Sequence, residues 1–342
     1  MVKFTYRLGV YMKRKKISTL LALLLGVSTF GACTNSDKKV DFANFWLEDA
    51  LNTSATIEET LTYDVKYEAQ NASLVNYTLN YTDGTYTTTL VSQQAADGKI
   101  VYTYTTQLNI TATYNLGEAS ASFDDTVTST VKFYAAEYGL QPISSMKEIK
   151  ASTPTAVSGS KVEDCYQQLH YTTAIIYNED CSNGIATVTS YTQTGEVAST
   201  TEDSFAIDQE KFSFLDNEQI LFALRGVRAS TTSASLNIYT PFAQAVQKVA
   251  LSTSTETSKN DSKDFTFLYN GEEVTKTITY RSFNVALDEK NPGATQVAWV
   301  AVKPENAPNK NHNMMLRLET PLSYGLGSLI YTLSSANYTK LN

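Results

Sequence analysis

The residues that build metal centres and catalytic dyads are scarce in this chain of 342 residues, which has two histidines and three cysteines. A structural zinc site needs about four such ligands, and neither His170 nor His312 belongs to a cluster of histidines and cysteines. The sequence also has no Gly-x-Ser-x-Gly elbow, no phosphate-binding glycine-rich loop and no dinucleotide fingerprint. We therefore expect no metal, no cofactor and no enzymatic activity, although a hydrolase site assembled from distant residues would leave no such motif.

Positive charge is also in short supply, with 27 lysines and arginines against 35 aspartates and glutamates. Six of these 27 basic residues and none of the 35 acidic ones precede Cys33, which leaves 21 basic groups in the remainder and a formal net charge of −14 there. Nucleic-acid phosphates and anionic membrane surfaces both require clustered lysines and arginines. This balance excludes nucleic acid as a partner and a polybasic membrane-binding surface.

No apolar run in the sequence is long enough to cross a bilayer comfortably. Residues 17–27 form the apolar run nearest the N-terminus, which is shorter than the roughly 20 residues that a membrane span needs. The basic residues 13–16 precede this run, and the small residues Gly31 and Ala32 follow it directly before Cys33. This order is typical of a secretory signal peptide, and Met12, just ahead of the basic block, is a candidate for the true start.

The stretch Thr29-Phe30-Gly31-Ala32-Cys33 resembles a lipobox, the cleavage and lipidation motif of bacterial lipoproteins. The resemblance implies that residues 1–33 contain the signal peptide and that Cys33 becomes the first residue of the mature chain, with a diacylglyceryl group on its sulfur. Phe30 departs from the family, which usually has leucine at that place. We expect a protein anchored by lipid on the extracytoplasmic face of a bacterial cell membrane, with an ordinary secreted protein as the alternative.

The other two cysteines, Cys165 and Cys181, are an even pair in a chain predicted to be exported, where a disulfide can persist. A disulfide between them is possible if residues 166–180 fold back as two short strands. If this segment is one extended strand, the two thiols lie tens of ångströms apart and cannot bond.

The composition favours strands, because the chain has 22 tyrosines, 14 phenylalanines and only 7 prolines. From residue 57 onward, apolar and polar residues alternate with a period of two, and dipeptides typical of hairpin turns interrupt the pattern at Asp83-Gly84, Asp97-Gly98 and Asn270-Gly271. The predicted strands include residues 108–114, 127–134, 166–177, 185–191 and 197–207. Residues 140–162 are richer in serine, proline and lysine, and we expect them to form a long loop.

Helical spacing occurs twice, at residues 42–51 and from Asp216, which forms a capping pair with Gln219, to Val227. We therefore predict a mainly β fold with two consecutive antiparallel, curved-sheet portions that resemble half-barrels, together with a few short helices. The expected organisation has four parts: residues 1–33 as the signal peptide, 34–56 as a tether and short amphipathic helix, 57–213 as an N-terminal antiparallel β portion, and 214–342 as a helix followed by a C-terminal antiparallel β portion.

A second resemblance concerns the body of the chain. The helix over residues 216–225, the long hairpins, and the final stretches Arg317-Leu318-Glu319-Thr320-Pro321 and Gly325-x-Gly327-Ser328-Leu329-Ile330 are similar to uncharacterised exported half-barrel β-proteins. Those proteins look like the LolA-type lipid carriers. In outline the resemblance covers residues 57–342, and it implies a curved antiparallel sheet that wraps an apolar groove.

Two binding functions follow as hypotheses. The first is a non-enzymatic envelope lipoprotein whose curved sheet holds a lipid or another apolar or amphipathic ligand. The second is a surface module that binds carbohydrate or protein through half-exposed tyrosines. A deep apolar groove would favour the first hypothesis, and a filled core with exposed aromatic side chains would favour the second.

Overall fold

The computed structural model describes Val40, Phe42 and residues 56–70, 75–135, 139–156, 159–208, 213–227, 231–253, 261–287, 295–302 and 313–341. Cys33, His312 and the helix predicted over residues 42–51, apart from Phe42, lie outside this part of the chain. Among the helices that the structure describes, none is long and apolar enough to cross a bilayer.

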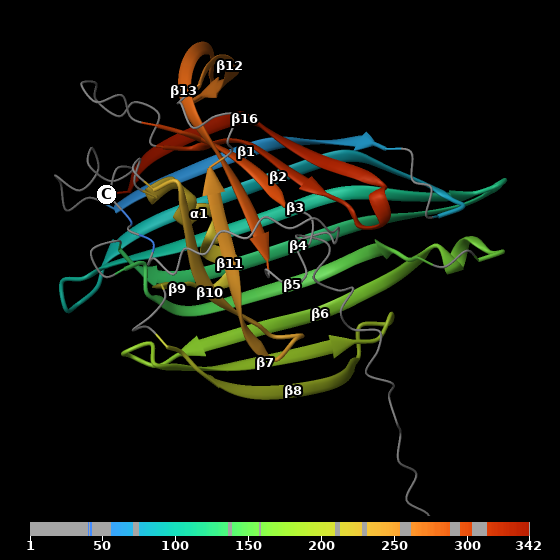
Figure 1. Ribbon diagram of the computed structural model, residues 1–342, viewed down its shortest axis with the longest axis horizontal. Helices are drawn as coiled ribbons and strands as arrows, with labels where there is room; N and C mark the ends of the chain where they lie inside the picture. The colour runs from blue at the N-terminus through green and yellow to red at the C-terminus, as the bar shows by residue number, and fades with distance from the viewer. Residues whose placement is uncertain are drawn as a thin grey trace, which may run out of the picture.

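The described strands form one 16-stranded sheet (Figure 1). The strands are β1 Thr56–Ala69, β2 Thr78–Gln94, β3 Ile100–Leu116, β4 Ala119–Tyr134, β5 Pro142–Pro154, β6 Tyr166–Tyr177, β7 Asn183–Tyr191, β8 Val197–Ala206, β9 Ser213–Phe214, β10 Ser233–Thr240, β11 Ala245–Thr253, β12 Asp261–Tyr269, β13 Glu272–Leu287, β14 Gln296–Ala301, β15 Met315–Pro321 and β16 Gly327–Leu341. These bounds contain all five strand segments named from the sequence, apart from the last residue of the fifth.

The early and late strands join at β1, which pairs with β2 on one side and with β16 on the other. The strand order is β8-β7-β6-β5-β4-β3-β2-β1-β16-β15-β14-β13-β11-β10-β9, with β12 attached to β13 and β16. The predicted fold class is therefore confirmed: the protein is mainly β with curved antiparallel sheet, and its two β portions share a single sheet.

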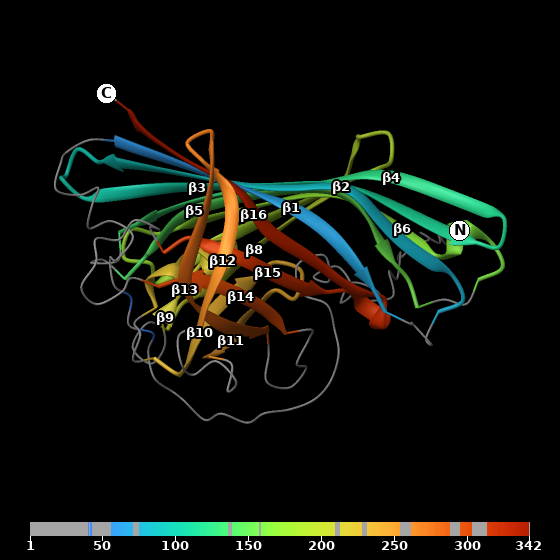
Figure 2. The same ribbon diagram turned by 90° about the horizontal axis from the view of Figure 1, so that it is seen from above.

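The two ends of this strand order meet through side chains. The ring of Tyr239 on β10 stacks on Phe205 of β8 with centroids 3.7 Å apart, and the Tyr239 hydroxyl donates a hydrogen bond of 2.5 Å to Asp203. Figure 2 shows the late strands beneath one half of the long strands β1–β6, whose other half extends beyond them. The molecule is thus a barrel at one end, here called the barrel end, and an open curved sheet at the other.

A short helical segment lies inside the barrel end. It consists of η4 (Asn217–Gln219), α1 (Ile220–Ala223) and η5 (Leu224–Gly226), so the predicted helix is a succession of short turns. The predicted capping pair is present, because Asp216 accepts a hydrogen bond from the backbone of Glu218 and Gln219 bonds back to the Asp216 backbone. The ring of Phe222 then packs against Tyr102, Tyr104 and Phe133 of the sheet, and so fills the barrel.

Tyrosines make up much of the core. Five of them are among the largest side chains that are less than 2% exposed: Tyr63, Tyr102, Tyr114, Tyr239 and Tyr331. Burial of these rings contributes a large hydrophobic stabilisation, and Tyr63 also donates a hydrogen bond to the backbone carbonyl of Met315. The alternation of tyrosine with threonine along β2 and β3 therefore sets the buried face of these strands.

Two of the three predicted hairpin turns are confirmed, at Asp97-Gly98 between β2 and β3 and at Asn270-Gly271 between β12 and β13. The turn predicted at Asp83-Gly84 is wrong, because these residues form a bulge inside β2, where the register with β3 shifts. A Cβ on Gly84 would lie 2.6 Å from the carbonyl oxygen of Val65, so glycine lets β1 approach the bulge closely.

The loop predicted over residues 140–162 is also wrong, since most of it is strand β5. The alternation was hidden by polar side chains on the buried face. Lys147 is one of them, and its ammonium lies 2.9 Å from the carboxylate of Glu218, which is also largely buried. A lysine that is buried only because a distant residue neutralises it does not look like a strand core position in the sequence. The 3₁₀ turn η3 (Val162–Asp164) begins at the last residue of this segment. A second 3₁₀ turn, η7 (Ser323–Gly325), connects β15 to β16.

The structure does not contain the possible disulfide between Cys165 and Cys181. β6 is one extended strand of 12 residues, so it spans about 40 Å and places Cys165 before one end and Cys181 beyond the other. Both side chains are buried and are not bonded to each other. The single-strand alternative is therefore the correct one.

Candidate functional site

Strands β4 and β5 separate in the middle of the sheet. Their pairing runs from Phe133 opposite Pro142 to Thr126 opposite Lys150 and stops there. Beyond that point, residues 119–125 of β4 pair with β3, and residues 151–154 of β5 pair with β6. The result is a gap in the backbone ladder, here called the β4–β5 split.

The carboxylate of Asp125 bridges this split. Its Oδ1 accepts a hydrogen bond of 2.8 Å from the backbone N–H of Ser152, and its Oδ2 accepts one of 2.9 Å from the Ser152 hydroxyl. Asp125 is only 2% exposed, because it follows the same inward alternation as Val127 and Val131. The side chain therefore replaces the strand partner that the Ser152 N–H has lost.

The surroundings of Asp125 favour its neutral form. Burial raises the pKa of its carboxyl to about 7, although the two hydrogen bonds from Ser152 act in the opposite direction, and the charge of Asp124 raises it further. Burial also raises the pKa of the Tyr81 and Tyr114 hydroxyls, and the charge of Asp125 adds to both shifts. Near neutral pH, Asp125 can therefore either accept or donate a proton, which is a feature of many functional sites.

A pocket of about 250 Å³ opens at the split. One wall is aromatic, because the rings of His170 and Tyr191 stack with centroids 4.5 Å apart and an interplanar angle of 25°. Polar side chains from β4, β5, β6 and the β7–β8 turn complete the lining, among them Asp124, Asp125, Lys150, Ser152, Gln168 and Gln193. The pocket thus combines an apolar face with several hydrogen-bonding groups, as small-molecule sites do.

The charges at the mouth of the pocket are mixed. Glu148 lies 3.5 Å from the Nε2 of His170 and 3.7 Å from the Nζ of Lys150. Asp124 accepts a hydrogen bond of 2.9 Å from the Thr111 hydroxyl on the neighbouring strand, whereas Asp125 is directed at Ser152. Because the two adjacent carboxylates engage different partners, they do not converge on one substrate atom in the way that a catalytic pair must.

The barrel interior offers much less space. A cavity of about 50 Å³ lies beside α1, and its lining is mostly apolar, with Leu108, Val127, Ile220 and Leu318 among the contributors. That volume accommodates a few water molecules. The side chains of the barrel therefore fill the space in which a LolA-like groove was expected.

The residues singled out from the sequence do not meet in this pocket, with one exception. His170 lies in its wall, Cys165 and Cys181 lie at opposite ends of β6, and Cys33 lies outside the described residues. The sequence indicates Asp124 and Asp125 only as a carboxylate pair, which adjacent strand positions direct to opposite faces, and it gives Asp125 no role of its own. A carboxylate at an inward position of a strand between Phe123 and Val127 is nevertheless a signal of a special site. In the described part of the chain, no group of three or more histidines, cysteines and acidic residues is arranged to hold a metal ion.

Comparisons with known proteins give a distant structural similarity and no match in sequence. No protein-family model and no curated protein sequence matches the chain. Among solved structures, the chain is similar to the crystal structure of a β-barrel-like protein of domain of unknown function DUF1849 from Brucella abortus. The two chains are 8% identical, the alignment covers 83% of this chain and 98% of that chain, and the TM-score is 0.42.

Proposed function

We propose that the protein is an extracytoplasmic, lipid-anchored, non-enzymatic binding protein that takes a small glycan into the pocket at the β4–β5 split. The observation that carries this proposal is the aromatic wall of His170 and Tyr191 beside the acidic and amide side chains of the pocket. Sugar rings present apolar C–H faces that pack on aromatic rings, and their hydroxyls bond to carboxylates and amides. The volume of about 250 Å³ suits one sugar residue or the end of a longer chain.

The barrel interior supports a glycan over an acyl lipid as the ligand. Sites for drug-sized ligands have volumes of about 300–1,000 Å³, whereas the cavity beside α1 has about 50 Å³. An acyl chain would have to displace Phe222 and the helical segment that carries it, and that ring contacts Tyr102, Tyr104 and Phe133.

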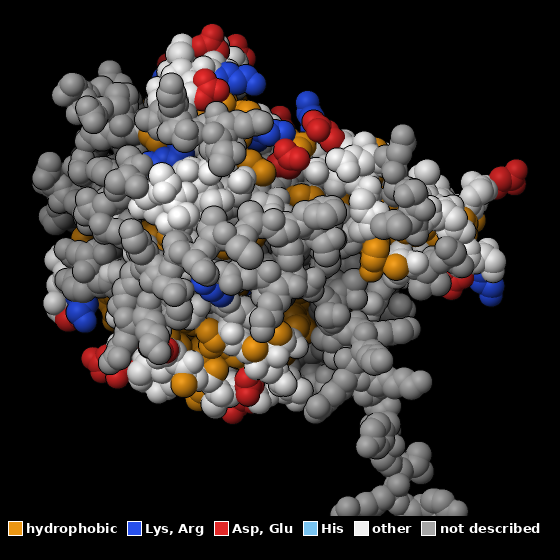
Figure 3. All heavy atoms as spheres, in the orientation of Figure 1, with side chains coloured by type: hydrophobic (Ala, Val, Ile, Leu, Met, Phe, Trp, Pro, Cys, Tyr) orange, Lys and Arg blue, Asp and Glu red, His pale blue; other side chains and the backbone are white. Residues whose placement is uncertain are grey.

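On the face shown in Figure 3, the lysines and arginines among the described residues are scattered and form no large basic patch there. This distribution favours a neutral ligand such as a glycan over a polyanionic one.

The experiment that tests the glycan is a screen of the purified protein against an array of mono- and oligosaccharides, followed by calorimetric titration of the sugar that binds. We expect Tyr191→Ala to weaken binding about tenfold, since a ring contact of this kind contributes up to about 1.5 kcal/mol. Tyr134→Ala is the matched control, because Tyr134 is also half-buried on the sheet but lies far from the pocket. Absence of binding on the array, or co-purification of a lipid in stoichiometric amount, would refute the glycan.

The anchor depends on Cys33, whose thiol would carry the diacylglyceryl group. Fractionation of cells that express the Cys33→Ala variant tests it. The substitution should move the protein to the soluble fraction or leave its signal peptide uncleaved. Firm membrane attachment of a correctly cleaved variant would refute the anchor while leaving the glycan pocket untouched.

A further inference from the structure

The segment that follows Cys33 joins the folded body at the barrel end. The backbone N–H of Val40 donates a hydrogen bond of 3.1 Å to the Ser213 hydroxyl on β9, and the same hydroxyl donates one of 3.3 Å to the Val40 carbonyl. Two residues later, Phe42 forms an antiparallel bridge with Val227, just after η5. The chain is therefore attached to the barrel at Val40, next to β9.

Covalent geometry limits how far this attachment point can lie from the lipid. Val40 lies seven positions after Cys33, so the chain between their Cα atoms spans at most about 25 Å. β4, with 16 residues, spans about 50 Å. The β9 side of the barrel end must therefore stay near the bilayer, while the opposite end of the sheet has room to extend away from it.

The same end carries an apolar patch on the outside of the sheet, formed by Met146, Ile176 and Ile185. Ile176 and Ile185 lie directly opposite each other on β6 and β7 and are 68% and 46% exposed, and Met146 on β5 is 56% exposed. Ile176 precedes Tyr177, whose ring lies 5.9 Å from that of Phe214 on β9. Because Tyr177 points to the buried face and Ile176 to the outer one, the apolar patch lies at the same end of the sheet as β9, on the opposite face of β6.

We infer that the barrel end faces the membrane and that the apolar patch rests on the lipid surface. The lipid on Cys33 and the patch then both attach the protein to the membrane. This inference rests on the proposed anchor at Cys33. The turn between β6 and β7 places the exposed carboxylates of Glu179 and Asp180 near the patch. They repel anionic headgroups, so the surface fits a zwitterionic bilayer.

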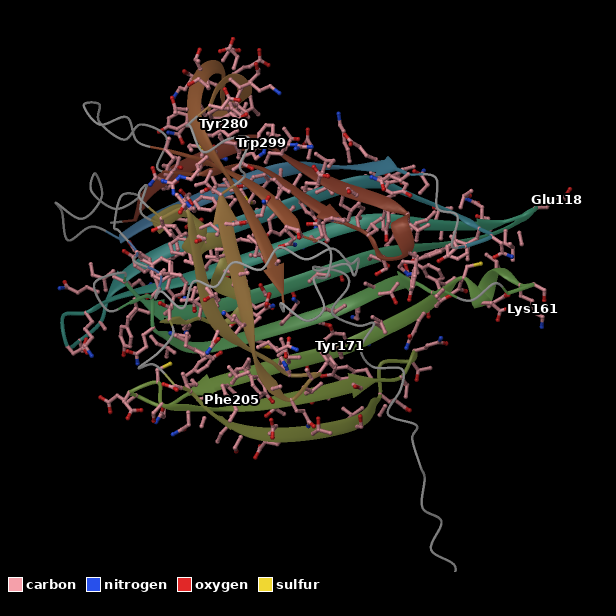
Figure 4. All side chains as sticks on the ribbon, viewed as in Figure 1. Glu118, Lys161, Tyr171, Phe205, Tyr280 and Trp299 are labelled. Carbon is pink, nitrogen blue, oxygen red and sulfur yellow. The ribbon has the colours of Figure 1, made fainter. Side chains whose placement is uncertain are left out.

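This orientation leaves the glycan pocket accessible. Its aromatic wall includes His170, which lies six residues before Ile176 on β6 and therefore about 20 Å from the patch. The tip of the β3–β4 hairpin, labelled Glu118 in Figure 4, lies at the opposite end of the sheet from β9 and points away from the bilayer. The pocket then faces the space outside the membrane, where a ligand arrives.

A matched pair of fluorescent labels tests the orientation in the full anchored protein. Glu179→Cys and Glu118→Cys each replace an exposed glutamate in a hairpin turn, and the turns lie at opposite ends of the sheet. Each lipidated variant is reconstituted into phosphatidylcholine vesicles that contain a quencher on the lipid headgroup. We expect quenching of the Glu179→Cys label to be several-fold stronger, and Cys165 and Cys181 to stay unlabelled because both are buried.

The patch is tested in the Glu179→Cys background. The double substitution Ile176→Ser and Ile185→Ser should reduce the quenching. Replacing part of the phosphatidylcholine with anionic phosphatidylglycerol should reduce it too. Val197→Ser, at 63% exposure and at the other end of the sheet, should leave it unchanged. Equal quenching at both ends, or an unchanged signal in the double variant, overturns the inference alone. Failure of the chain to enter the membrane fraction overturns the Cys33 anchor, and the inference with it.

Discussion

The barrel end and the β4–β5 split both bury carboxylates, but they treat the negative charge differently. In the barrel end, Glu59 makes a two-pronged ion pair with Arg225, with oxygen–nitrogen distances of 2.6 and 2.8 Å. Although burial lowers the pKa of Arg225, Glu59 raises it above its ordinary value, so Arg225 stays charged. At the split, Asp125 receives two hydrogen bonds from the neutral Ser152, and its pKa rises to about 7.

The difference shows what each region is suited for. A buried carboxylate with a full positive partner contributes to a unique, rigid arrangement, and Arg225 additionally donates to the carbonyl of Asn313. A buried carboxylate whose hydrogen-bond donors are neutral is destabilised in its charged form. Proteins tolerate this free-energy cost where a pocket uses the carboxylate. The ion pair of the barrel end is therefore suited to structural support, and Asp125 at the split is suited to a binding site.

The largest expected effect comes from removing the cation of the barrel end. Arg225→Met leaves Glu59 buried without its partner and should lower the free energy of unfolding by about 4 kcal/mol, measured by urea denaturation. The double variant Glu59→Gln with Arg225→Met removes both charges and should recover most of that loss. A double variant that is no more stable than Arg225→Met would show that the pair matters for packing and not for charge compensation.

The second effect concerns pH and the split. Because the folded pKa of Asp125 lies near 7, above its value in the unfolded chain, the folded protein holds a proton that the unfolded chain has released. This contribution to stability is therefore present at low pH and is lost as pH rises through 7, by about 3 kcal/mol between pH 5 and pH 8. Urea denaturation at both pH values should show that Asp125→Asn removes this part of the dependence of the unfolding free energy on pH. Asp124→Asn, at the exposed neighbour, should leave it nearly intact, and an unchanged dependence in Asp125→Asn would contradict the assignment.

A third variant tests a carboxylate that lies between these two extremes. Asp216 is buried and caps the helical segment, and it also accepts hydrogen bonds of 2.5 Å from Ser145 and 2.6 Å from Tyr177. Asp216→Ala should lower the free energy of unfolding by about 2 kcal/mol, since it removes the cap and leaves both hydroxyls without this acceptor. Asp216→Asn, which keeps an acceptor for the Glu218 N–H, should lose less in the same urea titration. Equal losses would show that charge, and not the cap, is what counts.

The smallest effect is expected at the mouth of the pocket. Lys150 is 56% exposed in its side chain and lies 3.7 Å from Glu148, so Lys150→Met should change the unfolding free energy by less than about 0.5 kcal/mol. Because Lys150 also lines the pocket, the same variant should weaken glycan binding in calorimetry. A large loss of stability would mean that the rim of the split is part of the support.

Local chemistry made several elements predictable. The turn at Asn270-Gly271 needs positive φ at both positions, which are 50° and 86° here, and asparagine followed by glycine is the usual way to achieve this. The capping pair of Asp216 and Gln219 is equally local, because both hydrogen bonds close within three residues. Alternation with a period of two predicted the long strands, since successive side chains point to opposite faces.

The candidate site was not predictable in the same way. Asp125 becomes special only because β5, which begins 17 residues later, leaves β4 at Lys150 and brings Ser152 next to the carboxylate. β5 itself looked like a loop, because Lys147 on its buried face is neutralised by Glu218, 71 residues away. Such compensation is invisible in any local window of sequence.

The mainly β fold could be read from the sequence, because strand-favouring composition and period-two alternation act within single strands. The acidic composition, the scarcity of catalytic motifs and the lipobox-like stretch at Cys33 could be read from residue identities alone. Only the tertiary structure decided that β1 pairs with β16, that Cys165 and Cys181 lie at opposite ends of β6, and that a split in the sheet holds a pocket. Those features depend on the register between segments far apart in the chain, where many side chains together select one arrangement.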